Sequence, residues 1–198
     1  MSSDSKVQAI VRALAGTYAL INSTATLNGV SVPDLAFGED PVGLLTYTPS
    51  GFMSLNIAAT QSQYRPANLT FPYNETDSNQ DWALVGQHTL SYAGPWSVSH
   101  DDSTTEKSGS LVHGPIWVAN VPKWTGIEEH SNYSVHETKS SEGFPKGTKL
   151  LRMESKWDNG NQGVLWWRRV DGGTDENDNW IPNSLINGSP LKEADEGK

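Results

Sequence analysis

Residues 43–58 read GLLTYTPSGFMSLNIA, and this stretch decides the fold class. Two runs rich in β-forming residues, 43–48 and 52–58, stand on either side of the turn Pro49-Ser50-Gly51. Two such runs joined by a short connection that contains Pro and Gly are typical of a β-hairpin. The stretch therefore predicts antiparallel β-structure.

A second hairpin is expected near the end of the chain, where residues 149–157 and 164–170 flank a loop that contains Asn159-Gly160. Between the two hairpins, a polar loop over residues 59–81 precedes a segment at 81–92 that fits a short helix or a strand. Further strand-like runs lie at residues 17–23, 94–99, 110–118 (interrupted by Pro115) and 126–137. Strand signals at intervals of roughly 10 residues predict an all-β fold, either a sandwich or a closed up-and-down antiparallel barrel of about eight to ten strands.

A short amphipathic helix is expected before the first strand. Its apolar residues are Val7, Ile10, Val11 and Leu14, with the i, i+3, i+4, i+7 spacing of one helix face. Gly16 ends the segment. The spacing leaves open whether the helix closes one end of a barrel or contacts a second subunit in a homodimer.

The chain has 198 residues and a formal net charge of −9, which fits one domain and disfavours several classes of partner. Nucleic acids and anionic membrane surfaces both require a basic footprint. No run approaches the roughly 20 apolar residues of a membrane span. The absence of cysteine excludes disulfides, thiolate catalysis and Cys-based zinc sites. We expect a helix over residues 1–15, a β-domain over 16–170 and an acidic surface tail over 171–198.

Sequons of the form Asn-x-Ser/Thr indicate a glycoprotein of the secretory pathway. They lie at Asn22, Asn68, Asn74, Asn132 and Asn187. We expect the mature part of a secreted protein whose signal peptide has been removed. A cytoplasmic protein rich in Ser, Thr and Asn is the alternative.

Five stretches, in conserved motif order, resemble the lipocalin-like (calycin) domain family. They are GTYAL at 16–20; GLLTYTPSGFMS at 43–54, similar to G-x-L-x-Y-T-P-x-G-x-M-S; YAGPW at 92–96, similar to Y-x-G-x-[WY]; His113 with Pro122, Trp124 and Gly126, similar to H…P-x-W-x-G; and LWWRR at 165–169, similar to L-x-W-x-R. The resemblance spans about residues 11–170.

This resemblance implies a lipocalin-like β-barrel with an internal hydrophobic cavity. Fungal relatives of this small lipocalin-like kind are encoded beside natural-product pathways. Some act there as cyclases, including catalysts of Diels–Alder-type ring closure. The sequence departs from the plain family pattern in its long 59–81 loop, its sequons and its acidic tail.

Common catalytic motifs are absent: the sequence has no GxGxxG, GxxxxGK[ST], HExxH or GxSxG. The five histidines lack the spacing of a metal cage. The oxygen-rich residues 171–179 lack the Gly and Glu positions of an EF-hand. We therefore expect no metal and no cofactor.

Strand alternation selects a carboxyl group as a candidate acid. If Asn132 carries a glycan and faces outward, the residues two positions away face outward too. The outward set is then Glu128 and His130, and the inward set is Glu129, Ser131 and Tyr133. A glutamate inside an apolar barrel has a raised pKa and can act as an acid or hydrogen-bond donor. Pairing with Arg152 or Arg168 for packing is the alternative role of Glu129.

Aromatic residues are the expected walls of the cavity, with core packing as the alternative role for each. The expected substrate-binding set is Tyr47, Phe52, Tyr92, Trp96, Trp117, Trp124 and Trp166. Trp117 and Trp124 flank a Pro-broken connection that we place at the barrel mouth, and His113 is expected on the same face as Trp117. The candidate catalytic residues are His113, Lys123, Glu129 and Tyr133.

Three functions fit these features. The first is a cofactor-independent cyclase that closes a ring in a hydrophobic polyketide or terpenoid intermediate by a pericyclic reaction, which needs positioning and a hydrogen-bond donor but no nucleophile. The second is a non-catalytic carrier of a small hydrophobic molecule. The third is a secreted surface protein whose cavity is not used. Turnover distinguishes the first from the second, and saturable binding distinguishes both from the third.

Overall fold

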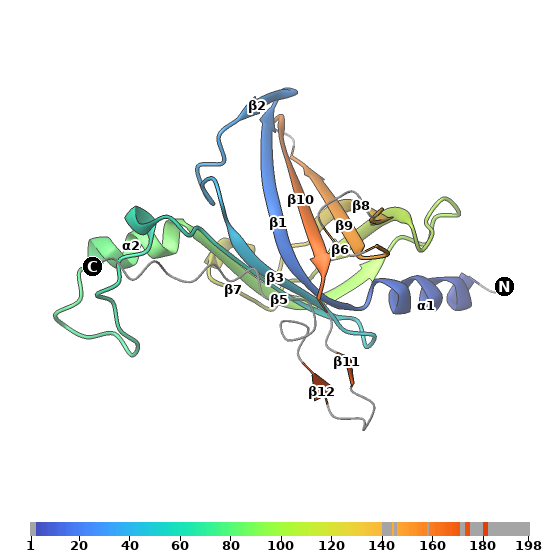
Figure 1. Ribbon diagram of the computed structural model, residues 1–198, viewed down its shortest axis with the longest axis horizontal. Helices are drawn as coiled ribbons and strands as arrows, with labels where there is room; N and C mark the ends of the chain where they lie inside the picture. Colours follow the sequence, from blue (N-terminus) through green and yellow to red (C-terminus); the bar gives the residue numbers. More distant parts are fainter. Residues whose placement is uncertain are drawn as a thin grey trace.

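The computed structural model (Figure 1) describes residues 3–139, 144, 146–157, 159–170, 173–174 and 180–181. Within them, eight antiparallel strands close into a barrel, as the resemblance implies. The barrel strands are β1 (Gly16–Leu27), β3 (Val42–Tyr47), β4 (Phe52–Ala58), β5 (Thr89–Val98), β6 (Ser108–His113), β8 (Glu129–Glu137), β9 (Lys149–Lys156) and β10 (Asn161–Arg169). Neighbours along the chain are neighbours in the sheet, and β1 pairs with β10 to close it.

Shorter elements surround the barrel. They are helices α1 (Ser3–Leu14) and α2 (Asn79–Gln87), the 3₁₀ turns η1 (Ser62–Tyr64) and η2 (Pro122–Trp124), strands β2 (Val30–Val32) and β7 (Val118–Ala119), and the ladder of β11 (Gly173–Thr174) with β12 (Trp180–Ile181). Neither helix among the described residues has the length and apolar character needed to cross a bilayer.

Most of the predicted elements are confirmed. Both hairpins form, and the first pairs Tyr47 with Met53 across the turn Pro49-Ser50-Gly51. The segment at residues 81–92 contains both a helix and a strand, because α2 ends at Gln87 and β5 begins at Thr89. The run at 110–118 divides into the end of β6 and the start of β7, and β2 was not predicted. The predicted acidic tail lies mostly outside the described residues.

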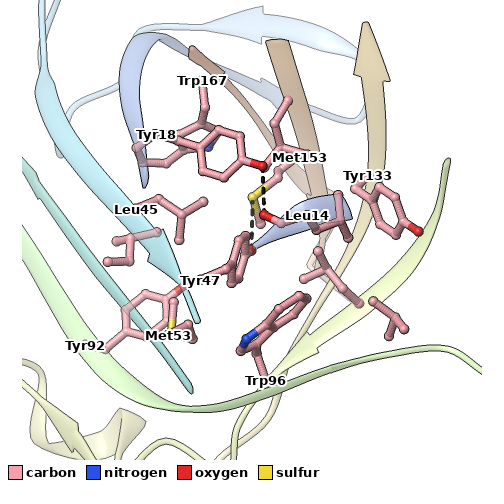
Figure 2. Close-up of a cluster of buried hydrophobic side chains, with 14 of the residues drawn as sticks. Leu14, Tyr18, Leu45, Tyr47, Met53, Tyr92, Trp96, Tyr133, Met153 and Trp167 are labelled. Carbon is pink, nitrogen blue, oxygen red and sulfur yellow. Dashed lines mark hydrogen bonds between the residues drawn. The ribbon is translucent and has the colours of Figure 1, made fainter. Parts of the chain in front are cut away.

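Large side chains fill one half of the barrel interior. Tyr18, Tyr47, Trp96 and Trp167 are each at most 4% exposed, and Figure 2 shows them converging from different strands. The rings of Tyr47 and Trp96 lie 4.3 Å apart between centroids, and those of Tyr18 and Tyr47 lie 6.3 Å apart edge-on. Such contacts among buried aromatic rings stabilise a core beyond their area of apolar contact.

Helix α1 closes the packed half of the barrel, at the end opposite β2 (Figure 1). Its residues Ile10 and Leu14 are buried in the same cluster as the barrel aromatics. The Tyr18 hydroxyl donates to the Leu14 carbonyl at 2.7 Å, and the Arg169 guanidinium donates to the carbonyls of Ala13 and Ala15. These bonds satisfy carbonyls that the last turn of a helix leaves without partners. The helix therefore plugs one end of the barrel, which is the first of the two roles that the sequence left open.

Truncation of a buried side chain on helix α1 measures how much the helix contributes to the stability of the fold. We expect Leu14→Ala to lower the free energy of unfolding by about 2–5 kcal/mol, because it leaves a void in a packed core. Arg12→Ala on the exposed face of the same helix is the control, with an expected change within about 0.5 kcal/mol. Urea denaturation monitored by Trp fluorescence checks both variants. Equally small changes for Leu14→Ala and Arg12→Ala would contradict the role of helix α1 as a plug.

Candidate functional site

A cavity of about 310 Å³ occupies the half of the barrel opposite helix α1. Its apolar wall comes from barrel strands and from three aromatic residues in connections. Among the residues of this wall are Leu55, Ile57, Leu90, Leu165, Phe37, Trp124 and Trp157. The volume lies at the lower end of the range of small-molecule sites, so the cavity suits a compact apolar molecule.

The loop after β2 holds Phe37 at the cavity. The Asp34 carboxylate accepts hydrogen bonds from the hydroxyl of Ser23 at 2.6 Å and from the backbone N–H of Phe37 at 3.0 Å. The carbonyl of Ala36 lies 2.8 Å from Nδ1 of His88, whose ring stacks on Tyr64. These contacts give an irregular segment a fixed position at the open end of the barrel.

One side of the cavity is polar. Glu129, at the start of β8, lines it together with Ser131 and Ser155, whose hydroxyl oxygens lie 2.7 Å apart. Burial raises the pKa of the half-buried Glu129 carboxyl, while a hydrogen bond with Trp157 and the charge of His130 lower it in part. The cavity therefore holds a carboxyl group that keeps its proton to a higher pH than an exposed glutamate does.

His113 is buried behind this wall, between two tyrosines. Its Nε2 lies 2.5 Å from the Tyr47 hydroxyl oxygen, and its Nδ1 lies 2.8 Å from that of Tyr92. The Tyr47 hydroxyl also lies 3.7 Å from Sδ of Met153 (Figure 2). Tyr92 and Met153 both line the cavity, so this chain of contacts begins and ends at its wall.

Burial fixes the protonation states along the chain of contacts. It lowers the pKa of the His113 imidazole to about 3. It raises the pKa of the Tyr47 and Tyr92 hydroxyls well above their usual 10.0, and for Tyr92 the charge of Glu129 adds to the rise. At neutral pH the imidazole is therefore uncharged and both tyrosines keep their protons.

The comparison with protein families identifies this architecture. The family model for the lipocalin-like domain matches residues 15–170. The chain belongs to the lipocalin-like domain family. Comparisons with curated proteins and with solved structures gave no match.

Two predicted catalytic residues of this lipocalin-like domain lie close to the cavity. Glu129 faces inward, as alternation along its strand predicts, and so does Ser131. His113 is also inside the barrel, 1% exposed, but it reaches the cavity indirectly, through Tyr92 on one side and through Tyr47 and Met153 on the other. Tyr133 is buried in the packed half (Figure 2). Its hydroxyl donates to the Thr105 carbonyl at 2.5 Å.

The connection around Pro115 differs from expectation. Trp124 lines the cavity, and its ring lies 5.5 Å from that of Tyr92. Trp117 instead lies on the outer surface, 63% exposed and edge-on to Phe52, so its expected position on the face of His113 is wrong. The reason is that β6 ends at His113 and the chain turns at Gly114, so strand alternation does not continue to Trp117. Lys123 is exposed in η2.

The remaining predicted substrate-binding residues divide between three positions. Tyr92 lines the cavity, while Tyr47 and Trp96 are buried in the packed half. Phe52 is 42% exposed on the outer face of β4. Trp166 also faces outward, next to the ring of His136, because its neighbour Trp167 takes the inward position. The outward positions of Phe52 and Trp166 correct our expectation that they line the cavity.

Several cavity residues were missed from the sequence. Phe37 lies in a connection without strand periodicity, and Trp157 follows the last residue of β9. Leu90, Met153 and Ser155 lie on strands and alternate with outward neighbours, so alternation combined with the register of the barrel would have found them. Among the residues that the structure describes, no group of three or more His, Asp or Glu side chains is arranged to hold a metal ion.

Buried His113 makes the stability of the fold depend on pH. The unfolded imidazole takes up a proton below about pH 6.5, whereas the folded one does so only near pH 3. The stabilisation is therefore complete above pH 6.5 and is lost as the pH falls. Between pH 7 and pH 5 we expect His113 to lower the free energy of unfolding by about 2 kcal/mol.

Urea denaturation at the two pH values checks this prediction. His113→Gln should lose most of the pH dependence, and His100→Gln, at an exposed position, should retain it. Titration of the wild-type imidazole by NMR gives a second measurement if His113→Gln does not fold. Protonation of folded His113 near pH 6.5 would contradict the burial between Tyr47 and Tyr92.

Proposed function

We propose that this lipocalin-like domain binds a small, mostly apolar molecule in the open half of its barrel and promotes ring closure of that molecule without a cofactor. One observation carries the proposal: a cavity of about 310 Å³ combines apolar walls with one half-buried carboxyl group of raised pKa. Apolar walls select the substrate and exclude water. The carboxyl group supplies a hydrogen bond where charge develops.

The walls favour a reaction that depends on positioning. In a pericyclic closure, π electrons of two parts of the substrate become new σ bonds, and no atom leaves. The rate then depends on how often the two parts meet in the reactive arrangement, and confinement supplies several kcal/mol of the barrier. Leu55, Ile57 and Leu90 on adjacent strands provide a continuous surface for this confinement.

Glu129 has the role of donor in this proposal. In its neutral form the carboxyl group donates a hydrogen bond to a carbonyl or quinone-methide oxygen and draws electron density from the reacting π system. The raised pKa keeps that form populated over a wider pH range. Glu128 and His130, on either side, are exposed and do not line the cavity.

The substrate class follows from the cavity and from the family resemblance. An apolar molecule with one oxygen acceptor matches a polyketide or terpenoid intermediate of fungal secondary metabolism, in which the resembling cyclases act. A carrier of the same molecule is the second candidate. The cavity supports it equally, and turnover separates the two.

Binding followed by product analysis tests the proposal. Trp fluorescence of the purified protein is titrated with a panel of reactive polyketide and terpenoid intermediates, because Trp124 and Trp157 line the cavity. We expect saturable quenching and a faster or stereochemically enriched cyclised product. Binding with every compound recovered unchanged would indicate a carrier, and no saturable binding would contradict both functions.

Substitution of Glu129 separates its role as donor from its role in packing. Glu129→Gln keeps an N–H donor, so we expect it to cyclise at a rate that does not vary with pH. The wild-type rate should fall as the pH rises through the pKa of Glu129, since only the neutral form donates. Glu129→Leu removes the donor and should be slower by about 100-fold.

Glu128→Gln is the matched control, because it changes the same group at the adjacent exposed position. We expect it to keep both the wild-type rate and its pH profile. Equal rates for wild type and Glu129→Leu would show that Glu129 donates nothing to the reaction.

A location in the secretory pathway is part of the proposal. Asn22, Asn68, Asn74 and Asn132 are exposed and accessible to glycosylation, and Asn187 lies outside the described residues. We expect N-glycosidase treatment of native protein to lower its mass. An unchanged mass would favour the cytoplasmic alternative.

A further inference from the structure

Tyr92 lies between the cavity and a buried imidazole. Tyr92 lines the cavity, and its hydroxyl oxygen lies 2.8 Å from Nδ1 of His113. Among the described residues, His113 is the hydrogen-bond partner of this hydroxyl. A hydroxyl has one proton to donate and lone pairs to accept with. Whether Tyr92 offers the cavity a proton or a lone pair therefore depends on whether its hydroxyl donates to His113 or accepts from it.

The tautomer of His113 decides the direction of that bond. A neutral imidazole carries one N–H and one bare nitrogen, so it donates to one of its two tyrosines and accepts from the other. If Nε2 carries the proton, the imidazole donates to Tyr47, and Tyr92 must donate to Nδ1. If Nδ1 carries the proton, the imidazole donates to Tyr92, whose own proton is then free to point into the cavity.

The two distances favour the second arrangement. Hydrogen bonds with an O–H donor are shorter than those with an N–H donor. The contact between Tyr47 and Nε2 is the shorter at 2.5 Å and fits a phenol that donates to a bare nitrogen. The contact between Nδ1 and Tyr92, at 2.8 Å, fits an N–H that donates to a phenol oxygen.

The surroundings of Tyr47 agree with this assignment. The other acceptor near its hydroxyl is Sδ of Met153 at 3.7 Å, and a thioether sulfur is a weak acceptor. Tyr47 loses little by turning its proton from Met153 to the imidazole.

We propose that Tyr92 is a second hydrogen-bond donor, beside Glu129, that recognises a carbonyl oxygen on the molecule bound in the cavity, and that His113 and Tyr47 are positioning residues that hold its proton in that direction. This inference rests on the proposed binding function. It adds a specificity rule: between two apolar molecules of the same shape, the cavity prefers the one with a carbonyl group beside Tyr92.

A matched pair of probes tests the rule. Fluorene and 9-fluorenone have the same fused rings and differ by one carbonyl group. Equilibrium dialysis gives the affinity of each for wild type, Tyr92→Phe and Tyr18→Phe. Tyr18→Phe is the control, because it removes a buried hydroxyl that bonds to Leu14 in the packed half. We expect Tyr92→Phe to lower the affinity for 9-fluorenone about tenfold and to leave the affinity for fluorene unchanged. Tyr18→Phe should alter neither affinity.

Spectroscopy distinguishes donation from a structural effect of the substitution. The C=O stretch of fluorenone bound to wild type should lie at a lower frequency than in an alkane solvent, and this shift should be absent in Tyr92→Phe. Nitrogen-15 NMR of wild-type His113 should place the proton on Nδ1. Tyr47→Phe frees the imidazole to change tautomer, so we expect a partial loss of fluorenone affinity, about two- to fivefold.

The outcomes separate this inference from the proposed function. Equal effects of Tyr92→Phe on both probes, or an unshifted C=O stretch in wild type, would overturn the role of Tyr92 while cavity binding stands. A proton on Nε2 would overturn the positioning role of His113. Failure of both probes to bind wild type would overturn the proposed binding function and this inference with it.

Discussion

The burial of His113 between Tyr47 and Tyr92 is the interaction that joins the packed half of the barrel to the wall of the cavity. The imidazole cannot be charged at neutral pH, because burial lowers its pKa to about 3. It therefore needs one donor and one acceptor, and the two tyrosines supply them from β3 and β5. Tyr47 is packed against Trp96 on one side of this link, whereas Tyr92 lines the cavity on the other. Loss of the link would leave a buried polar group without partners, at a cost of about 1–3 kcal/mol.

The cavity lies at one end of the barrel because side-chain size changes along the strands. Strand β9 presents Leu151 and Met153 inward and then Ser155, and β10 presents Trp167 and then Gly163 toward the open end. A side chain at Gly163 would meet the ring of Trp157, which lies 3.2 Å from the position of an added Cβ. Large residues and helix α1 fill one half, and small residues leave space in the other. A barrel of eight strands has room for little more than this.

The sequence predicts the parts of the structure that depend on local pattern. The hairpin around Pro49-Ser50-Gly51 follows from turn residues between two β-forming runs, and the inward position of Glu129 follows from alternation along one continuous strand. Alternation fails for Trp117, because the chain turns at Gly114 before reaching it. It also cannot choose between the adjacent Trp166 and Trp167, since that choice depends on the register with β1 and β9. The bond network of His113 joins three strands, and no local pattern encodes it.

The central claim is that a ligand enters the open half of the barrel and leaves the packed half unchanged. Met53 and Met153 are both 4% exposed and belong to the same buried cluster, but Met153 lines the cavity and Met53 does not. Methyl NMR of the two methionines during titration with 9-fluorenone therefore tests the claim most directly. The account predicts a saturable shift of the Met153 methyl signal with little change at Met53. A shift at Met53 alone, or equal shifts at both, would contradict it.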